Sequence, residues 1–176
     1  RIFFSTGEKS QFNEQDESAD RDITQIEIGH AGVSRPFVST PSNELEAAFS
    51  PDGRWVAYQS DESGKWEIYV RPYAGPGARR QISVDGGMGP VWNPQGGELF
   101  YQTPTALMAV RIQNGIAAGA PTKLFSCRKS ADYRREFDVS PDGQRFLFME
   151  PATPRTEIDV ISNWFDELRA RVPTGR

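Results

Sequence analysis

Hydrophobic residues recur along this chain in short runs, several of which alternate with polar residues, and turn-forming residues separate these runs. The run at 66–70 alternates large apolar and polar side chains, as a half-buried strand does. It belongs to a predicted sheet over 46–83, whose strands are expected at 47–49, 55–58, 66–70 and 79–82. The same order is expected once more at 89–92, 98–101, 107–110 and 122–125, with a third turn enlarged over 115–121.

One turn motif occurs three times: Phe-Ser-Pro-Asp-Gly at 49–53, Trp-Asn-Pro-Gln-Gly at 92–96 and Val-Ser-Pro-Asp-Gly at 139–143. Proline presets φ at the second turn position, aspartate accepts local backbone hydrogen bonds, and glycine takes the positive φ that closes the turn. We therefore interpret Asp52 and Asp142 as structural residues. The middle copy has Asn93 and Gln95 instead, and we expect a weaker turn there.

The repeat predicts a β-propeller, because its glycines are 43 and then 47 residues apart and one propeller blade has that length. We expect an all-β fold: a propeller fragment of about three to four antiparallel blades with a short C-terminal helix. The whole chain, 1–176, is then one partial propeller. Its blades are expected at about 1–40, 46–83, 89–126 and 136–161.

The two ends depart from the repeat. The first blade has predicted strands at 2–5, 23–28 and 35–38 but no inner strand, and the last, with strands at 136–139, 145–149 and 157–161, has no outer one. A helix is expected at 163–171, with an apolar stripe that is typical of docking onto the protein body. Because open propellers leave strand edges unpaired, we expect either a fragment of a longer propeller or a homodimer that completes the ring.

The motifs at 50–61 and 66–73 resemble the WD40-like repeats of TolB-like propellers. The ending Asn-Trp-Phe-Asp-Glu-Leu at 163–168 is similar to the tail of bacterial proteins that join such a propeller to a serine/threonine kinase. The resemblance covers most of the chain from Ser39 onward. It implies a binding or scaffold module, and it favours an extracytoplasmic, for example periplasmic, location.

Composition narrows the classes of partner. A formal charge of −4 without a basic run argues against nucleic acid, and no apolar stretch is long enough to span a bilayer. A single cysteine, Cys127, allows no internal disulfide. The single histidine, His30, lies in a predicted turn.

Catalytic motifs are absent from the sequence. It contains no Gly-x-Ser-x-Gly elbow, no His-Glu-x-x-His and no phosphate-binding Gly-x-x-x-x-Gly-Lys. We expect no enzyme activity, no cofactor and no metal site.

A ligand site is expected on the propeller axis. The connections at 41–46, 84–90 and 128–135 each link one blade to the inner strand of the next, so they gather around the axis on one face. Their mixed charge suits a protein, peptide or cell-envelope ligand, although exposed loops are polar in any case. The alternative is an accessory propeller of a hydrolase (a peptidase) or a lyase, with catalytic residues outside this chain. The candidate ligand-binding residues are Asn43, Glu44, Glu46, Asp85, Met88, Tyr133, Arg134 and Arg135.

Overall fold

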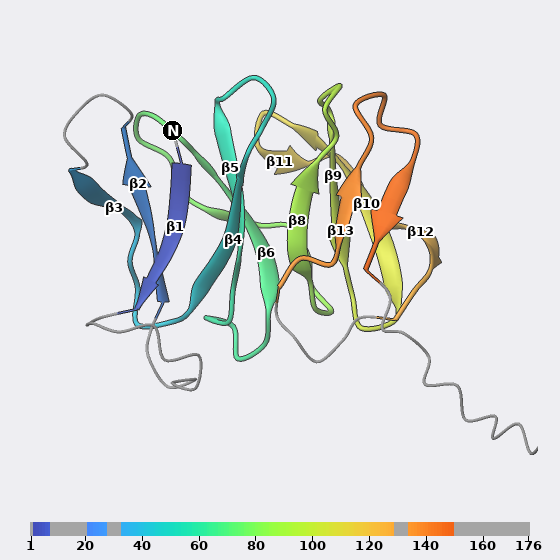
Figure 1. The fold of residues 1–176 in the computed structure, drawn as a ribbon, viewed down its shortest axis with the longest axis horizontal. Coiled ribbons are helices and arrows are strands. Elements are labelled where there is room, and N and C mark those ends of the chain that lie inside the picture. Colours follow the sequence, from blue (N-terminus) through green and yellow to red (C-terminus); the bar gives the residue numbers. More distant parts are fainter. Residues whose placement is uncertain (1, 8–20, 28–32, 129–133, 150–176) are drawn as a thin grey trace, which may run out of the picture.

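The computed structural model describes residues 2–7, 21–27, 33–128 and 134–149, and these residues form antiparallel β-sheets (Figure 1). The first sheet contains β1 (Ile2–Gly7), β2 (Arg21–Ile26) and β3 (Ser34–Val38). The second contains β4 (Glu44–Phe49), β5 (Trp55–Ser60), β6 (Glu67–Pro72) and β7 (Arg80–Gln81). The third contains β8 (Met88–Trp92), β9 (Glu98–Gln102), β10 (Ala106–Gln113), β11 (Ile116–Ala117) and β12 (Thr122–Ser126). The fourth pairs β13 (Phe137–Val139) with β14 (Phe146–Phe148).

The sheets follow one another side by side as the blades of a propeller, which confirms the all-β fold class (Figure 1). Their first strands are neighbours in space: β4 lies against β8, and β8 against β13. A hydrogen bond from Trp92 Nε1 to the Ala48 carbonyl, 3.1 Å long, joins β4 to β8 directly. The first strands of the second, third and fourth sheets therefore lie on the axial side of the propeller, and the later strands of these sheets lie farther out.

In the second and third blades the second strand joins the two neighbouring blades, because successive side chains point to opposite faces of a sheet. In β5, Tyr58 packs back against the first sheet, while Ala57 packs forward against the third. In β9, Tyr101 packs back against the second sheet and Phe100 forward against the fourth. One strand thus contributes to two separate cores.

The repeated turn is built as the sequence predicts. In the first copy the Ser50 hydroxyl donates to Asp52 Oδ1 at 2.6 Å, and the Arg54 amide donates to the same oxygen at 3.1 Å. The Ser50 hydroxyl in turn accepts the Trp55 amide at 3.0 Å, and Gly53 has a φ of 68°. The Ser140 hydroxyl and the Gln144 amide donate to Asp142 in the same way in the third copy.

In the middle turn, Asn93 provides the side-chain oxygen that accepts a backbone amide, as Asp52 does in the first turn. Asn93 Oδ1 accepts the Gln95 amide at 3.0 Å, and Asn93 Nδ2 donates to Glu98 Oε2 at 3.3 Å. Gln95 Nε2 then reaches the next turn and donates to the Pro141 carbonyl at 2.8 Å. That this turn is weaker stays a prediction.

Several element boundaries differ from the expectation. The strand β4 begins at Glu44, ahead of 47, and β7 has only two residues. The enlarged turn at 115–121 contains a further strand, β11, which pairs with β10 through a two-residue loop. Asn114 and Gly115 have φ of 50° and 71°, as a type I′ hairpin turn requires. The predicted strand at 157–161 and helix at 163–171 lie outside the described residues.

Replacing Asp52 with alanine removes the acceptor of two turn hydrogen bonds, so we expect Asp52→Ala to lower the free energy of unfolding by about 1 kcal/mol at neutral pH. The Ser50 hydroxyl, followed by the Arg54 amide, lowers the pKa of Asp52. The contribution is therefore present above the ordinary carboxyl pKa and is lost as the pH falls through the lowered value. Urea denaturation at neutral and acid pH measures both effects. Arg54→Ala keeps the backbone donor and is the control; equal losses in both variants would contradict the role of Asp52.

Candidate functional site

The first strands of the second and third blades carry a bulge at the same place near the axis. The pairing of β4 with β5 shifts register between Leu45 and Ala48, and that of β8 with β9 shifts between Met88 and Val91. Glu46 and Gly89, seven residues before the turn glycine of their blade, have φ of 54° and 59°. A bulge bends its strand locally, so both strands turn at the same level of the propeller.

Glu46 is the unusual member of this pair. A left-handed backbone suits glycine and costs a residue that has a Cβ atom about 1 to 2 kcal/mol. Residues kept in such a conformation are often functional residues. The half-buried Glu46, which the sequence selected as a candidate, is therefore a stronger candidate in the structure.

A buried glutamine connects the second blade to the bulge of the third. Gln59, which is fully buried on β5, accepts the Gly89 amide at 2.7 Å through its Oε1. The absence of a side chain at Gly89 lets Arg135 lie close, because a Cβ there would meet Arg135 Cα at 3.1 Å. Gln59, Gly89 and Arg135 therefore form a continuous contact that runs across three blades. We call this edge of the propeller, formed by residues 41–46, 84–90 and 134–136, the axial rim.

Asn43 and Glu44 hold the beginning of the axial rim in place. The Asn43 amide donates to Asp61 Oδ1 at 2.8 Å, and Asn43 Nδ2 donates to Asp61 Oδ2 at 2.9 Å. The Thr40 hydroxyl donates to Glu44 Oε1 at 2.5 Å, and Glu44 is fully buried as the first residue of β4. Burial raises the pKa of the Glu44 carboxyl, and hydrogen bonding from Thr40 lowers it to a smaller extent.

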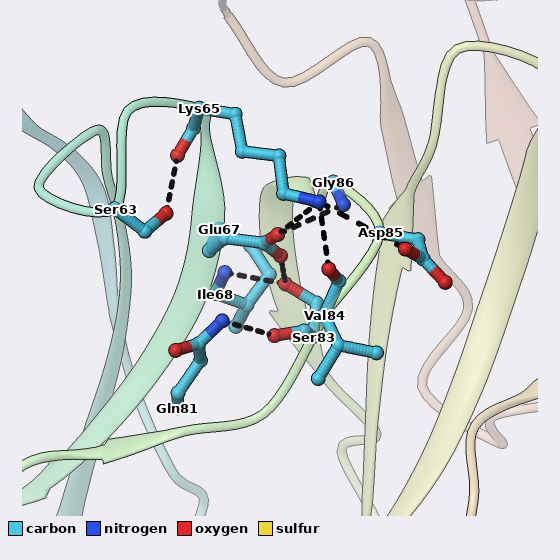
Figure 2. Close-up of polar contacts among 9 residues, drawn as sticks. All are labelled: Ser63, Lys65, Glu67, Ile68, Gln81, Ser83, Val84, Asp85 and Gly86. Atoms are coloured by element: carbon cyan, nitrogen blue, oxygen red, sulfur yellow. Dashed lines mark hydrogen bonds and ion pairs between the residues drawn. The ribbon is translucent and has the colours of Figure 1, made fainter.

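A second buried carboxylate clamps the connection between the second and third blades (Figure 2). The carboxylate of Glu67, fully buried on β6, accepts a hydrogen bond from the Ser83 hydroxyl and one from the Gly86 amide at 3.0 Å. Lys65 Nζ lies 3.4 Å from Glu67 Oε1 and donates to the Val84 carbonyl at 2.7 Å. The clamp fixes the backbone on both sides of Asp85, whose side chain is 96% exposed.

The candidate residues differ in how far they are exposed to solvent. Asp85, Arg134 and Arg135 are exposed, and Asn43, Glu46 and Met88 are half-buried. Glu44 is buried within the fold, so it supports the axial rim and does not offer a contact surface. Tyr133 lies outside the described residues.

The rim carries charges of opposite sign at its two ends. The acidic Glu46 lies on the second blade, and the basic Arg134 and Arg135 precede the fourth. Asp85 and the half-buried Met88 come between them along the chain. Such an arrangement can bind an extended ligand that carries both charges.

A separate groove of about 220 Å³ lies among the repeated turns, away from the axial rim. It is lined by parts of 50–55 and 95–97, by Trp92 and by residues near the β10–β11 turn. None of the candidate rim residues that the structure describes contributes to it.

Among the described residues, no group of three or more His, Cys, Asp and Glu is placed to hold a metal ion. None of these residues belongs to a helix that is long and apolar enough to cross a membrane.

Two solved structures are similar to this chain. The putative TolB from Agrobacterium tumefaciens matches with a TM-score of 0.56 at 19% identity, over 74% of this chain and 51% of that one. TolB from Acinetobacter baumannii matches with a TM-score of 0.55 at 16% identity, over 76% of this chain and 33% of that one. The fold is that of a TolB-like propeller. This chain thus spans about half and about a third of the two structures, and no family model or curated protein matches it.

The residues that support the axial rim of this TolB-like propeller were missed by the sequence analysis. Gln59 and Gln102 are 43 residues apart, which is the spacing of the first two turn glycines. Both are fully buried at the end of a second strand. Aligning the repeats beyond the turn motif would have identified this position. Repeat alignment would not have identified Glu67 and Lys65, because their contacts with 83–86 form only when the chain folds.

Gln59 and Gln102 form a matched pair for mutation. Gln59→Leu leaves the Gly89 amide without its acceptor, so we expect the free energy of unfolding to fall by about 1 to 3 kcal/mol. Among the described residues, Gln102 Nε2 contacts Cys127 Sγ at 3.8 Å, and none of them donates a hydrogen bond to Gln102 Oε1. Gln102→Leu should therefore cost clearly less. Urea denaturation compares the two, and similar losses would show that the bond to Gly89 is unimportant.

The buried Glu44 predicts a pH dependence. Because burial raises its pKa, the folded protein holds this proton more tightly than the unfolded chain does. Stability should therefore fall as the pH rises from the ordinary value of 4.5 through the raised one. Glu44→Gln should remove this decline while keeping the hydroxyl contacts. Denaturation of both proteins from acid to neutral pH provides the measurement, and a difference that does not change with pH would refute the prediction.

Proposed function

We propose that this chain is a non-catalytic binding module whose axial rim recognises an extended segment of a protein or peptide partner. One observation carries the proposal: buried side chains hold the backbone of the rim in place, while charged side chains on the rim are exposed to solvent. Glu67 and Gln59 are among the buried residues, and Asp85 and Arg135 are exposed. A surface that is ordered before binding loses less conformational entropy when a ligand binds.

The charges of the rim suggest the kind of peptide. Glu46 on the second blade suits a lysine, an arginine or an amino terminus, and Arg134 and Arg135 suit an acidic side chain or a carboxyl terminus. Met88, half-buried between these ends along the chain, offers an adaptable apolar contact. The TolB-like fold supports the proposal only as an architecture that is common among binding modules. Assembly as a homodimer stays a prediction.

A library of random peptides displayed on phage tests the proposal without a known partner. We expect selected peptides to carry a basic and an acidic group, and Arg135→Ala to weaken their binding about tenfold. Glu46→Gly removes the carboxylate and suits the left-handed backbone, so it should weaken binding without loss of stability. Gln95→Ala in the groove among the turns is the control and should bind normally. Peptides that lose binding only with Gln95→Ala would place the site on the groove and refute the proposal.

A further inference from the structure

The fourth blade has a face that the described residues leave uncovered. Aligned on the turn glycine, Leu147 corresponds to Ala57 and Phe100, which pack forward against the next blade. Leu147, however, is 76% exposed, and Met149, two residues along, is 64% exposed. The opposite side chains of β14, Phe146 and Phe148, pack back against the third blade. The forward face of this sheet is therefore apolar and open.

The composition of this face differs from that of the earlier blades. At the position of Met149 the second and third blades have Gln59 and Gln102. Asp138, the cross-strand partner of Leu147, stands where those blades have Ala48 and Val91. Met149 lacks the amide with which Gln59 caps a neighbouring bulge, and Asp138 adds a charge. The face therefore suits an amphipathic element better than a further blade of the same repeat.

The same chain contains a segment with the complementary pattern. The sequence at 163–171 predicts a helix whose apolar stripe consists of Trp164, Phe165 and Leu168 and extends to Val172. Arg169 and Arg171 lie in its last predicted turn, so the segment offers positive charge for the exposed Asp138. The predicted strand at 157–161 is the third strand of this same blade and ends two residues before 163, so the segment is expected to begin beside the sheet that carries Leu147 and Met149.

We propose that residues 163–171 dock their apolar stripe on the forward face of the fourth blade, over Leu147 and Met149. This docking covers apolar side chains that otherwise face water, and each such burial is favourable. The proposal concerns a surface separate from the axial rim and does not depend on ligand binding there.

Disulfide trapping in the full chain tests this contact. In a Cys127→Ser background, which removes the single native cysteine, Leu147→Cys and Leu168→Cys are combined and oxidised mildly at low protein concentration. We expect an internal disulfide, seen as a monomer with altered mobility that reverts on reduction. Arg54→Cys combined with Leu168→Cys is the control and should not crosslink internally. Crosslinked dimers would show that a second copy covers the face, and absence of any disulfide would show that the segment does not reach it; either result overturns the proposal.

A second measurement does not depend on cysteine chemistry. If the segment covers Leu147, then Leu147→Asn places a polar amide in an apolar contact without setting a like charge opposite Asp138, and it should lower the melting temperature by about 2 to 4 °C. Val84, which is 67% exposed on the axial rim, provides the matched control, and Val84→Asn should leave the melting temperature nearly unchanged. An equally small effect of both substitutions would overturn the proposal.

Discussion

The structure depends on the two-sided packing of the second strand in the second and third blades. Because side chains alternate across a sheet, β5 places Tyr58 in one core and Ala57 in the next, and β9 repeats this with Tyr101 and Phe100. A shift of one residue in either strand would exchange the two faces and spoil both cores together. The repeated turn, in which Asp52 in the second blade and Asn93 in the third accept local hydrogen bonds, sets this register from its start.

The axial rim follows from the same register. The alternation that sends Ala57 forward also sends Gln59 forward, and there its amide oxygen meets Gly89 in the next first strand. Gly89 in turn allows Arg135 to approach from the following blade. The rim is therefore assembled by contacts between residues of three consecutive blades. The proposed binding surface and the stability of the fold depend on the same supporting residues.

Sequence reasoning predicted the architecture well because the turn motif is local and periodic. The strand β11 was missed although Asn114 and Gly115 are a strong hairpin signal, since the enlarged turn was interpreted as a loop. Glu44 was selected as a ligand contact because it is charged and near a connection, yet the structure buries it beneath Thr40. A charge next to a turn does not reveal whether tertiary packing will enclose it. The Glu67 clamp could not be predicted, because it joins residues of two strands and a connection through tertiary contacts alone.

The central claim is that the axial rim binds an extended peptide. Amide hydrogen exchange of the full chain, with and without a peptide selected from the displayed library, tests it most directly. The account predicts that the peptide slows exchange at 43–46, 84–89 and 134–136, and leaves the turns at 51–54, 94–97 and 141–144 unchanged. Slowed exchange confined to those turns would contradict it and would place the binding surface at the opposite ends of the strands.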